Sequence, residues 1–218
     1  MKIAIDGPAG AGKSTVARTL AQILGFIYVD TGAMYRALTW KALGNGIDLK
    51  NSEALYELAK NIKIHFQSNS DKQRIICDNK DITDYIRLPE VSAQVSLIAS
   101  YTTVREIMVQ SQREMAETMN VVMDGRDIGE CVLPEADYKF YLTADINERV
   151  KRRIKDLEIQ GYIIDIKSAK EDILKRDLAD STRDVGALKI LEDSIIIDTS
   201  NLSIKQVLDK ILSIIQEG

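Results

Sequence analysis

The sequence predicts an α/β fold in which a parallel β-sheet is flanked by helices. Three observations support this prediction. Short apolar runs alternate with helix-periodic segments over residues 2–43. Further apolar runs, at residues 120–123, 138–142 and 194–198, have the length of buried strands. Longer helix-periodic segments separate these runs. The 218 residues allow one large domain, or one domain that carries an insertion.

The first elements follow one another in a strand–helix–strand–helix order. Residues 2–6 read KIAID, a short apolar strand that a glycine-rich turn ends. Apolar residues at helical spacing predict a helix over 13–24, and Gly25 is expected to terminate it. A strand over 26–29 and a helix over 33–43 come next. This order is typical of a parallel sheet with helical crossovers.

Residues 62–83 interrupt that pattern. Residues 62–66 and 74–77 alternate between apolar and polar side chains, and polar turn residues lie between and after them. Alternation of this kind predicts strands with one buried face. We therefore expect a small antiparallel sheet inserted into the α/β frame.

The second half returns to the α/β pattern. Residues 89–119 have helical periodicity and lead into the strand at 120–123. Asp145 and Glu148 have the spacing of a capping box that opens a charged helix, and residues 148–184 read as solvated helices joined by a loop. Ser203 and Gln206 form a second capping box before an apolar helical stripe, which we interpret as packing surface.

Composition excludes several classes of protein. The 29 basic and 33 acidic residues give a net charge of −4, which argues against binding to nucleic acid through bulk charge. His65 is the one histidine in the sequence, which argues against triads with a histidine base and against histidine-rich metal sites, so a bound cation must rest on oxygen ligands. Cys77 and Cys131 lie far apart without metal-type spacing. With no apolar run long enough to span a membrane, we expect a soluble, cytoplasmic protein.

The most informative motif directly follows the first strand. Residues 7–14 match the phosphate-loop pattern G-x-x-x-x-G-K-[ST], between a predicted strand and a predicted helix. The glycines allow backbone N–H groups to converge on phosphate oxygens at a helix N-terminus. Lys13 would bridge the β- and γ-phosphates of ATP, and the Ser14 hydroxyl would bind Mg²⁺. The predicted ATP-binding residues here are Gly7, Pro8, Ala9, Gly10, Ala11, Gly12, Lys13, Ser14 and Thr15.

Phosphate loops serve GTPases, motor ATPases and small-molecule kinases. The sequence lacks the Asn-Lys-x-Asp guanine motif of GTPases, and its length favours a kinase over a motor ATPase. The segments 30–36 and 124–129 each begin at the carboxyl end of a predicted strand and contain an arginine. Arg176, Asp177, Asp180 and Arg183 share one helical face by their spacing. Such a set of arginines suits an acceptor that is itself a phosphate ester.

Five motifs occur in one order along nearly the whole chain: the phosphate loop, D-T-G-A-M-Y-R, V-S-A-Q-V-S followed by V-R-E, D-G-R-D-I-G, and R-D-x-x-D-S-T-R. In this the sequence closely resembles the bacterial cytidylate kinases, within the nucleoside monophosphate kinase family. The resemblance implies a P-loop NTPase core over about residues 1–30, 84–145 and 190–218. It also implies a monophosphate-binding (NMP-binding) region over about 31–105, enlarged by the inserted sheet 62–83, and a short helical lid over about 149–185.

The same resemblance implies roles for individual residues. Arg36 and Arg126 would hold the acceptor phosphate, with Thr31 near it, and Ser96, Arg105 and Asp127 would read the cytosine edge. Arg176, Asp180 and Arg183 would face the sugar and the transferring phosphoryl group, so that Lys13, Arg126, Arg176 and Arg183 form the catalytic set. Arg149 and Arg153 would approach ATP, although Arg152 is also near, and Asp124 would orient Mg²⁺ through water. Taken alone, Thr31 is as well explained as a helix N-cap, and Asp124 as a buried cap at a strand end.

The implied activity is transfer of the ATP γ-phosphoryl group to CMP or dCMP with Mg²⁺. We expect a monomer whose partners are these small molecules, and neither nucleic acid nor a membrane. The residues themselves leave open another small-acceptor kinase, of the adenylate or shikimate type, and a nucleotide-switched binding module. Residues 184–188, DVGAL, lack the proline usual in the family after the lid.

Overall fold

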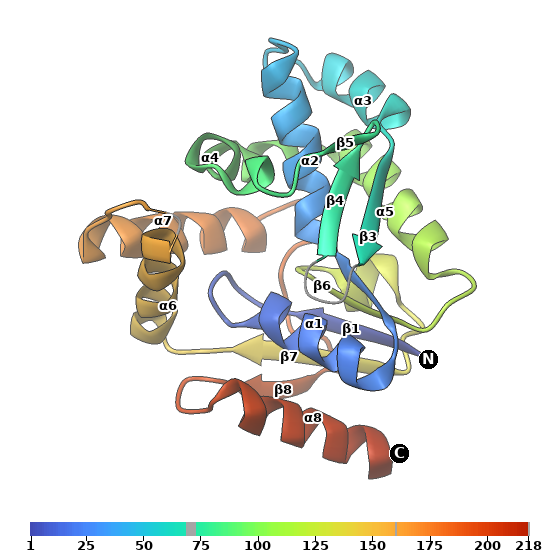
Figure 1. The fold of residues 1–218 in the computed structure, drawn as a ribbon, viewed down its shortest axis with the longest axis vertical. Coiled ribbons are helices and arrows are strands. Elements are labelled where there is room, and N and C mark those ends of the chain that lie inside the picture. Colours follow the sequence, from blue (N-terminus) through green and yellow to red (C-terminus); the bar gives the residue numbers. More distant parts are fainter. Residues whose placement is uncertain (69–72, 160, 218) are drawn as a thin grey trace. The chain divides into compact units, whose positions relative to one another are not determined.

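The computed structural model describes residues 1–68, 73–159 and 161–217 (Figure 1). The chain forms two compact units. Unit 1 comprises Met1–Tyr28 and Thr118–Gly218, and unit 2 comprises Val29–Glu117.

A parallel sheet is the centre of unit 1. Strand β1 (Lys2–Asp6) lies between β6 (Val121–Gly125) and β7 (Tyr138–Thr143), and β8 (Ile195–Asp198) pairs with β7, all in parallel register. Strand β2 (Ile27–Asp30) completes the order β2-β6-β1-β7-β8. The predicted parallel sheet flanked by helices is therefore confirmed.

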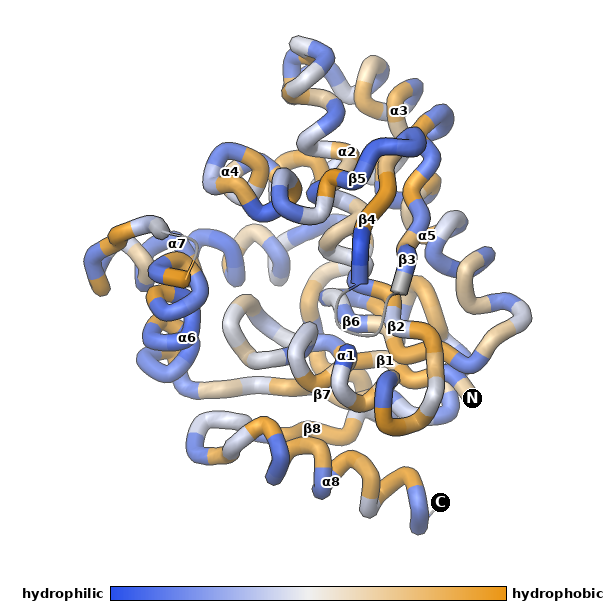
Figure 2. The backbone as a smooth tube through the Cα atoms, in the orientation of Figure 1, coloured by the Kyte–Doolittle hydropathy of each residue, from blue (hydrophilic) through white to orange (hydrophobic). Residues whose placement is uncertain are grey.

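Helices α1 (Lys13–Leu24) and α8 (Ile204–Glu217) share one apolar core with the strands of unit 1. The hydropathy colouring shows the strands and the core-facing turns of α8 as mostly apolar (Figure 2). Fully buried side chains such as Ile3, Leu20 and Phe140 fill this core. Burial of these side chains stabilises the fold, and their close packing makes the sheet rigid. The carboxyl ends of β1 and β6, where the phosphate loop and the D-G-R-D-I-G motif begin, are therefore held in fixed positions.

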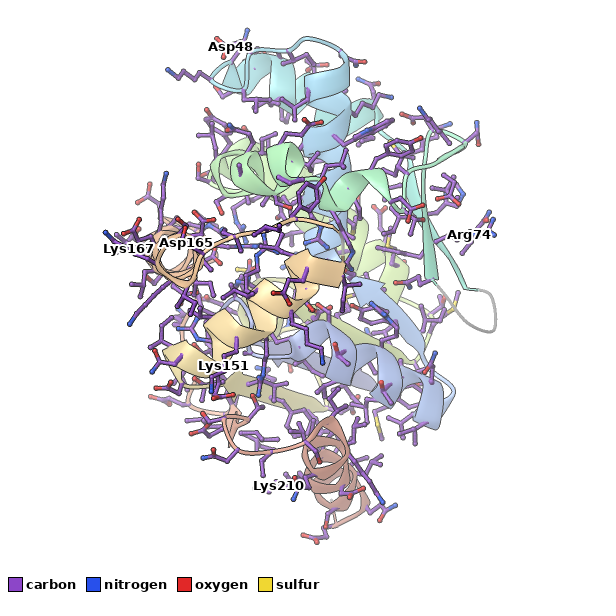
Figure 3. All side chains as sticks on the ribbon, turned by 60° about the vertical axis from the view of Figure 1, so that its left-hand side comes forward. Asp48, Arg74, Lys151, Asp165, Lys167 and Lys210 are labelled. Carbon is purple, nitrogen blue, oxygen red and sulfur yellow. The ribbon has the colours of Figure 1, made fainter. Side chains whose placement is uncertain are left out.

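Two further helices, α6 (Ile146–Ile159) and α7 (Ile166–Ser181), pack against each other around a small core of Val150, Ala169 and Ile173. Their outward faces carry many charged side chains together with exposed apolar ones such as Leu178, and Lys151 and Lys167 lie exposed on them (Figure 3). Asp165 caps α7 by accepting hydrogen bonds from the N–H groups of Lys167 and Ser168. The expected solvated helices over 148–184 are confirmed.

The two predicted capping boxes have different outcomes. Ser203 and Gln206 form the reciprocal bonds, since the Ser203 N–H donates to Gln206 Oε1 (2.9 Å) and the Gln206 N–H donates to Ser203 Oγ (3.3 Å). The box at Asp145 is wrong. The N–H of Asp145 donates to Ser200 Oγ at 2.8 Å, and Glu148 instead pairs with Lys151 at 2.6 Å. The hydroxyl of Ser200, which is distant in sequence, thus takes the place of the Glu148 carboxylate as acceptor for the Asp145 N–H.

Unit 2 is built on helices and a small sheet. The helices are α2 (Thr31–Gly44), α3 (Ser52–Asn61), α4 (Pro89–Ile98) and α5 (Thr102–Ala116), with a short turn η1 (Tyr85–Arg87). Strands β3 (Ile64–Ser68), β4 (Gln73–Cys77) and β5 (Lys80–Asp81) form an antiparallel sheet, as predicted. The turn expected between β3 and β4 falls on residues 69–72, outside the described residues.

Gly7 is the position in the phosphate loop where a side chain would clash most severely. Its φ is +147°, and a Cβ built there would lie 2.0 Å from the backbone oxygen of Leu142. We expect Gly7→Ala to destabilise the protein by more than about 3 kcal/mol, because the clash is with backbone that cannot move aside. Gly25→Ala, at φ +67° with open space around the Cβ, should cost only about 1 kcal/mol. Urea unfolding of both variants measures the difference, and equal stabilities would contradict this reading.

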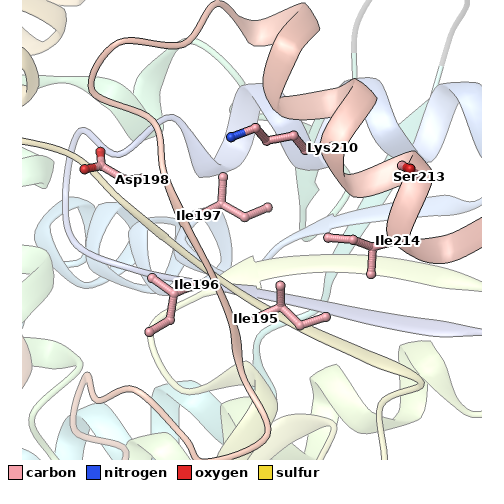
Figure 4. Close-up of a pocket in the computed structure, with 7 residues that line it drawn as sticks. All are labelled: Ile195, Ile196, Ile197, Asp198, Lys210, Ser213 and Ile214. Carbon is pink, nitrogen blue, oxygen red and sulfur yellow. The ribbon is translucent and has the colours of Figure 1, made fainter. Parts of the chain in front are cut away.

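A hollow of about 380 Å³ lies between β8 and α8, lined by Ile195, Ile196, Ile197, Asp198, Lys210, Ser213 and Ile214 (Figure 4). Its lining is largely isoleucine and brings together no set of groups suited to phosphoryl transfer. None of the described helices combines the length and apolarity needed to cross a membrane.

Candidate active site

The phosphate loop joins β1 to α1, as the motif predicts. Gly12 precedes the helix in a left-handed conformation and offers no side chain to cap it, so backbone N–H groups at this end of α1 point out of the helix. Lys13 is only 5% exposed, and its Nζ donates to the carbonyl oxygen of Pro8 at 2.7 Å. The ammonium group of Lys13 therefore lies against the backbone of the phosphate loop. This arrangement presents positive charge to an anion.

Ser14 and Asp124 lie together at the start of α1. Ser14 Oγ donates to Asp124 Oδ2 at 2.7 Å, and the Tyr28 hydroxyl donates to Asp124 Oδ1 at 2.8 Å. A serine hydroxyl and a carboxylate are hard oxygen ligands of the kind that Mg²⁺ prefers. In the described part of the chain no three acidic, histidine or cysteine side chains form a metal-binding cluster. The pair fits a Mg²⁺ ion that takes its other ligands from water and phosphate.

Arg126 and Arg176 lie near Lys13 in unit 1, and Asp180 links Arg126 to Arg183. Arg126 Nε donates to Asp180 Oδ2 at 2.6 Å, and Arg183 forms an ion pair with the other oxygen of Asp180. Asp180 is 1% exposed. Although burial raises its pKa, the guanidinium groups of Arg126, Arg183 and Arg176 hold the pKa of Asp180 below the ordinary value. One carboxylate therefore fixes two of the predicted catalytic arginines.

The surroundings of Lys13 disfavour its charged form in the free protein. Burial lowers the pKa of Lys13 well below its ordinary value, and the guanidinium groups of Arg126 and Arg176 lower it further. Asp124 and Asp180 act in the opposite direction without restoring it. A polyanion placed against Lys13 would supply the missing negative charge. The electrostatics of unit 1 therefore favour a bound phosphate group.

Helix α6 contributes arginines to the phosphate loop. Arg149 donates to the carbonyl oxygen of Ala9 at 3.1 Å and pairs with Asp177, which accepts from the Ala9 N–H at 3.3 Å. Arg152 Nη2 donates to the carbonyl oxygen of Thr199 at 2.7 Å, and its Nη1 donates to the carbonyl oxygen of Gly10 at 3.4 Å. Arg149, which was predicted to approach ATP, therefore contacts the phosphate loop. Arg152 contacts the same loop.

In unit 2, Asp30 organises the start of α2. Its carboxylate accepts from the Ala33 N–H at 2.7 Å and pairs with Arg36 at 3.0 Å. Asp30 is therefore the N-cap of α2, and the helix begins two residues before the predicted Ala33. Thr31 is the first residue inside the helix, so its interpretation as the N-cap is wrong.

Arg105 is the most buried arginine among the predicted ligands of unit 2. It lies on α5 at 2% exposure, donates to the carbonyl oxygen of Ala99 at 3.2 Å, and places its guanidinium 5.7 Å from the centre of the Tyr35 ring. Ser96 lies on α4 and is partly exposed. Burial of a fixed arginine is the arrangement expected of a residue that reads hydrogen-bonding groups.

Comparison with known proteins agrees with the geometry. A sequence model described as cytidylate kinase matches residues 3–217. The chain belongs to the cytidylate kinase family. Cytidylate kinases of Bacillus cereus and Bacillus thuringiensis are each 46% identical to it over 215 residues, covering 99% of this chain and 96% of theirs. The resemblance inferred from the five motifs is confirmed, and the protein is a phosphotransferase of this family.

Solved structures support the fold. An uncharacterized protein from Eubacterium ventriosum superposes with a TM-score of 0.54 at 15% identity, covering 100% of this chain and 99% of that one. A shikimate kinase from Bacteroides thetaiotaomicron superposes with a TM-score of 0.51 at 12% identity, covering 99% and 98%. At these identities the likeness establishes the P-loop kinase architecture alone.

The structure adds Tyr28 and Thr199 to the site, which the sequence analysis did not name, and gives partners to Arg152 and Asp177, which it did. Arg152 and Thr199 both contact the phosphate loop: Arg152 donates to the carbonyl oxygen of Gly10, and Thr199 Oγ1 lies 3.1 Å from the carbonyl oxygen of Ala11. Tyr28 orients Asp124, and Asp177 binds Arg149. Arg152 and Asp177 had signals in the sequence, namely the arginines of 149–153 and the helical spacing of 176–183, whereas Tyr28 and Thr199 had none. Arg153, predicted to approach ATP, lies half-buried on α6.

Asp6, directly before the phosphate loop, gives the stability of the protein a distinctive pH dependence. Burial raises the pKa of Asp6 from 3.8 to about 6. Because the folded state binds this proton more tightly than the unfolded state, its contribution to stability is fully present below about pH 4 and is lost as pH rises through 6. The difference amounts to about 3 kcal/mol, at 1.36 kcal/mol for each pH unit.

We therefore expect the free energy of unfolding of the wild type to fall by about 3 kcal/mol relative to Asp6→Asn between pH 3 and pH 8. Subtracting the variant cancels the contributions of the other carboxyl groups, including Asp180 with its lowered pKa. Urea titrations of both proteins at four pH values make the measurement. A constant difference across this range would show that Asp6 titrates normally.

Proposed function

We propose that this protein transfers the γ-phosphoryl group of ATP directly to CMP or dCMP, giving ADP and CDP or dCDP. The observation that supports this most is the cationic cluster of buried Lys13 and partly buried Arg126 and Arg183, in which Asp180 pairs with both arginines next to a phosphate loop. Two nucleotides that carry phosphates repel each other, and fixed arginines offset that repulsion. Membership in the cytidylate kinase family points to CMP as the acceptor.

The chemistry requires positioning and charge neutralisation. The attacking oxygen of a nucleoside monophosphate is already ionised at neutral pH, so no general base is needed. Lys13 would neutralise the ATP phosphates, and Arg126, Arg176 and Arg183 would stabilise the charge on the phosphoryl group in transit. Ser14, and Asp124 through water, would hold Mg²⁺, which supplies further charge neutralisation at the phosphates.

The acceptor nucleotide is proposed to be held by three groups of residues, which bind its phosphate, its sugar and its base. Arg36 and Arg126 would bind its phosphate, with Thr31 near it, and Arg176, Asp180 and Arg183 would contact the sugar side. Ser96, Arg105 and Asp127 would read the base. Cytosine offers an amino donor at N4 and acceptors at N3 and O2, which suit a carboxylate and an arginine, whereas uracil reverses N3 and position 4. A mismatched, buried polar pair costs about 1–3 kcal/mol.

The remaining assignments complete the proposal. Residues 7–15 of the phosphate loop, with Arg149 and Arg153, would bind ATP, the phosphoryl donor. The helical lid over about 149–185 would close to exclude water, because an open site would hydrolyse ATP. The protein would act as a cytoplasmic monomer.

An acceptor panel tests this proposal. Coupled detection of ADP is measured with CMP, dCMP, UMP, AMP and shikimate at saturating ATP and Mg²⁺. We expect turnover with CMP and dCMP to exceed that with UMP and AMP by at least about tenfold, the factor that one mismatched polar pair produces, and none with shikimate. Equal turnover of AMP would overturn the assignment to cytosine. ADP release that is indifferent to CMP would favour a nucleotide-switched module instead.

A further inference from the structure

Asp6 connects the phosphate loop, which contains Lys13, with the D-G-R-D-I-G motif at residues 124–129. It is the last residue of β1 and directly precedes Gly7, and it is 7% exposed. Its Oδ1 accepts from the N–H of Ile128 at 2.9 Å, and its Oδ2 accepts from the N–H of Gly129 at 2.8 Å. Both oxygens are therefore used on two consecutive N–H groups of the short helical turn η2 (Ile128–Val132).

That turn follows Arg126 and Asp127 without a gap. The bonds from Asp6 fix the backbone one and two residues after Asp127, on the neighbouring strand's carboxyl end. The bond from the Cys131 N–H to the carbonyl oxygen of Asp127, at 2.7 Å, closes the other side of the turn. The segment that carries the proposed acceptor ligands is therefore attached, through one carboxylate, to the first residue of the phosphate loop.

We propose that Asp6 is a positioning residue, whose carboxylate sets the Arg126–Asp127 segment in register with the phosphate loop for phosphoryl transfer. This inference rests on the proposed function. Transfer requires the donor and acceptor groups to be aligned, and a displacement of about 1 Å costs about a hundredfold in rate. An ionised carboxylate suits two N–H donors, because each oxygen accepts one of them.

Stability does not account for this residue. Because burial raises the pKa of Asp6, the ionised carboxylate that predominates at neutral pH stabilises the folded state less than the protonated form does. A residue kept only for stability would be better replaced by a neutral isostere. Structures commonly tolerate such unfavourable groups at functional sites, where the geometry that they impose is needed.

Asp6→Asn is the decisive variant. Its amide keeps the shape of the side chain but offers one acceptor oxygen, so one of the two N–H groups faces an NH₂ donor. At pH 7.5 we expect kcat with CMP to fall at least about tenfold, by misalignment, with KM for ATP unchanged within about twofold and Tm equal to or above that of the wild type. Asp137→Asn is the matched control, because Asp137 Oδ2 likewise accepts a backbone N–H, that of Lys2, at 2.5 Å at the other end of β1.

The control should retain wild-type kcat. A kcat of Asp6→Asn within twofold of the wild type, or a loss of kcat matched by a lower Tm, would overturn the proposal. If Asp6→Asn does not fold, Asp6→Ser carries the same test, and failure of both to fold would make Asp6 a folding residue and overturn the proposal as well. Because every value is a ratio to the wild type with CMP, a wild type that does not phosphorylate CMP would instead refute the proposed function.

Discussion

Replacing Arg126 with methionine is expected to lower kcat/KM for CMP by about a thousandfold, equivalent to about 4 kcal/mol of transition-state stabilisation. Arg126 is largely buried, and its Nε lies 2.6 Å from Asp180. The change removes a cation from the phosphoryl-transfer site and leaves Asp180 with fewer positive partners. ATP should still bind, since Lys13 and the backbone of the phosphate loop are intact. Steady-state kinetics with varied CMP, together with calorimetric titration of ATP, measure both effects.

Two variants sharpen this prediction. Arg126→Lys keeps the charge but loses the planar fork, so it should recover only part of the rate. Arg74→Met removes an exposed arginine from β4, whose ion pair with Asp81 spans 3.7 Å, and should keep wild-type kinetics. If Arg126→Met retained kcat/KM within about threefold of the wild type, a threefold change being below 1 kcal/mol, the assigned role would be refuted. An equal loss of ATP affinity would refute it too.

Lys13→Met is expected to reduce kcat about a thousandfold without lowering Tm. Burial and the neighbouring guanidinium groups of Arg126 and Arg176 already penalise the charged lysine, so its removal relieves repulsion in the free protein. Loss of activity would thus come with unchanged or increased stability, a pairing typical of functional residues. Differential scanning calorimetry and the coupled ADP assay measure the two quantities.

The control for this variant is Lys151→Met, which removes an exposed lysine from α6. It should leave both kcat and Tm near the wild-type values, because exposed ion pairs contribute about 1 kcal/mol or less. A Lys13→Met protein with more than a tenth of wild-type kcat, which would leave less than about 1.4 kcal/mol to the missing charge, would contradict the role given to Lys13. A large decrease in its Tm would show that the lysine holds the loop together instead.

Local patterns explain what the sequence could predict. The phosphate loop, the α1 helix ended by Gly25, and the capping box of Ser203 and Gln206 depend on residues within a few positions of one another. The alternation over 62–66 and 74–77 predicted the pairing of β3 with β4 for the same reason. In each case neighbouring side chains and backbone geometry decide the structure, so one segment contains the whole signal.

Tertiary contacts explain what it could not. Arg152 and Gly10 are 142 residues apart in sequence, and Asp6 and Ile128 are 122 apart. From the sequence, Arg149, Arg152 and Arg153 were equally good candidates for contact with the phosphate loop. The orientation of α6 about its axis decides which of these side chains reach it. The predicted capping box of Asp145 and Glu148 does not form, because Ser200, two residues after β8, accepts the Asp145 N–H instead. Such choices depend on packing that no short window of sequence contains.

The fate of the γ-phosphoryl group tests the central claim most directly. A single turnover of γ-labelled ATP with excess enzyme and CMP is quenched over a time course, and the label is followed into CDP and into inorganic phosphate. If the cationic cluster around Lys13 directs transfer between two nucleotides, nearly all of the label enters CDP, and omission of CMP leaves it on ATP. Label that accumulates in inorganic phosphate at the same rate with and without CMP would contradict the account.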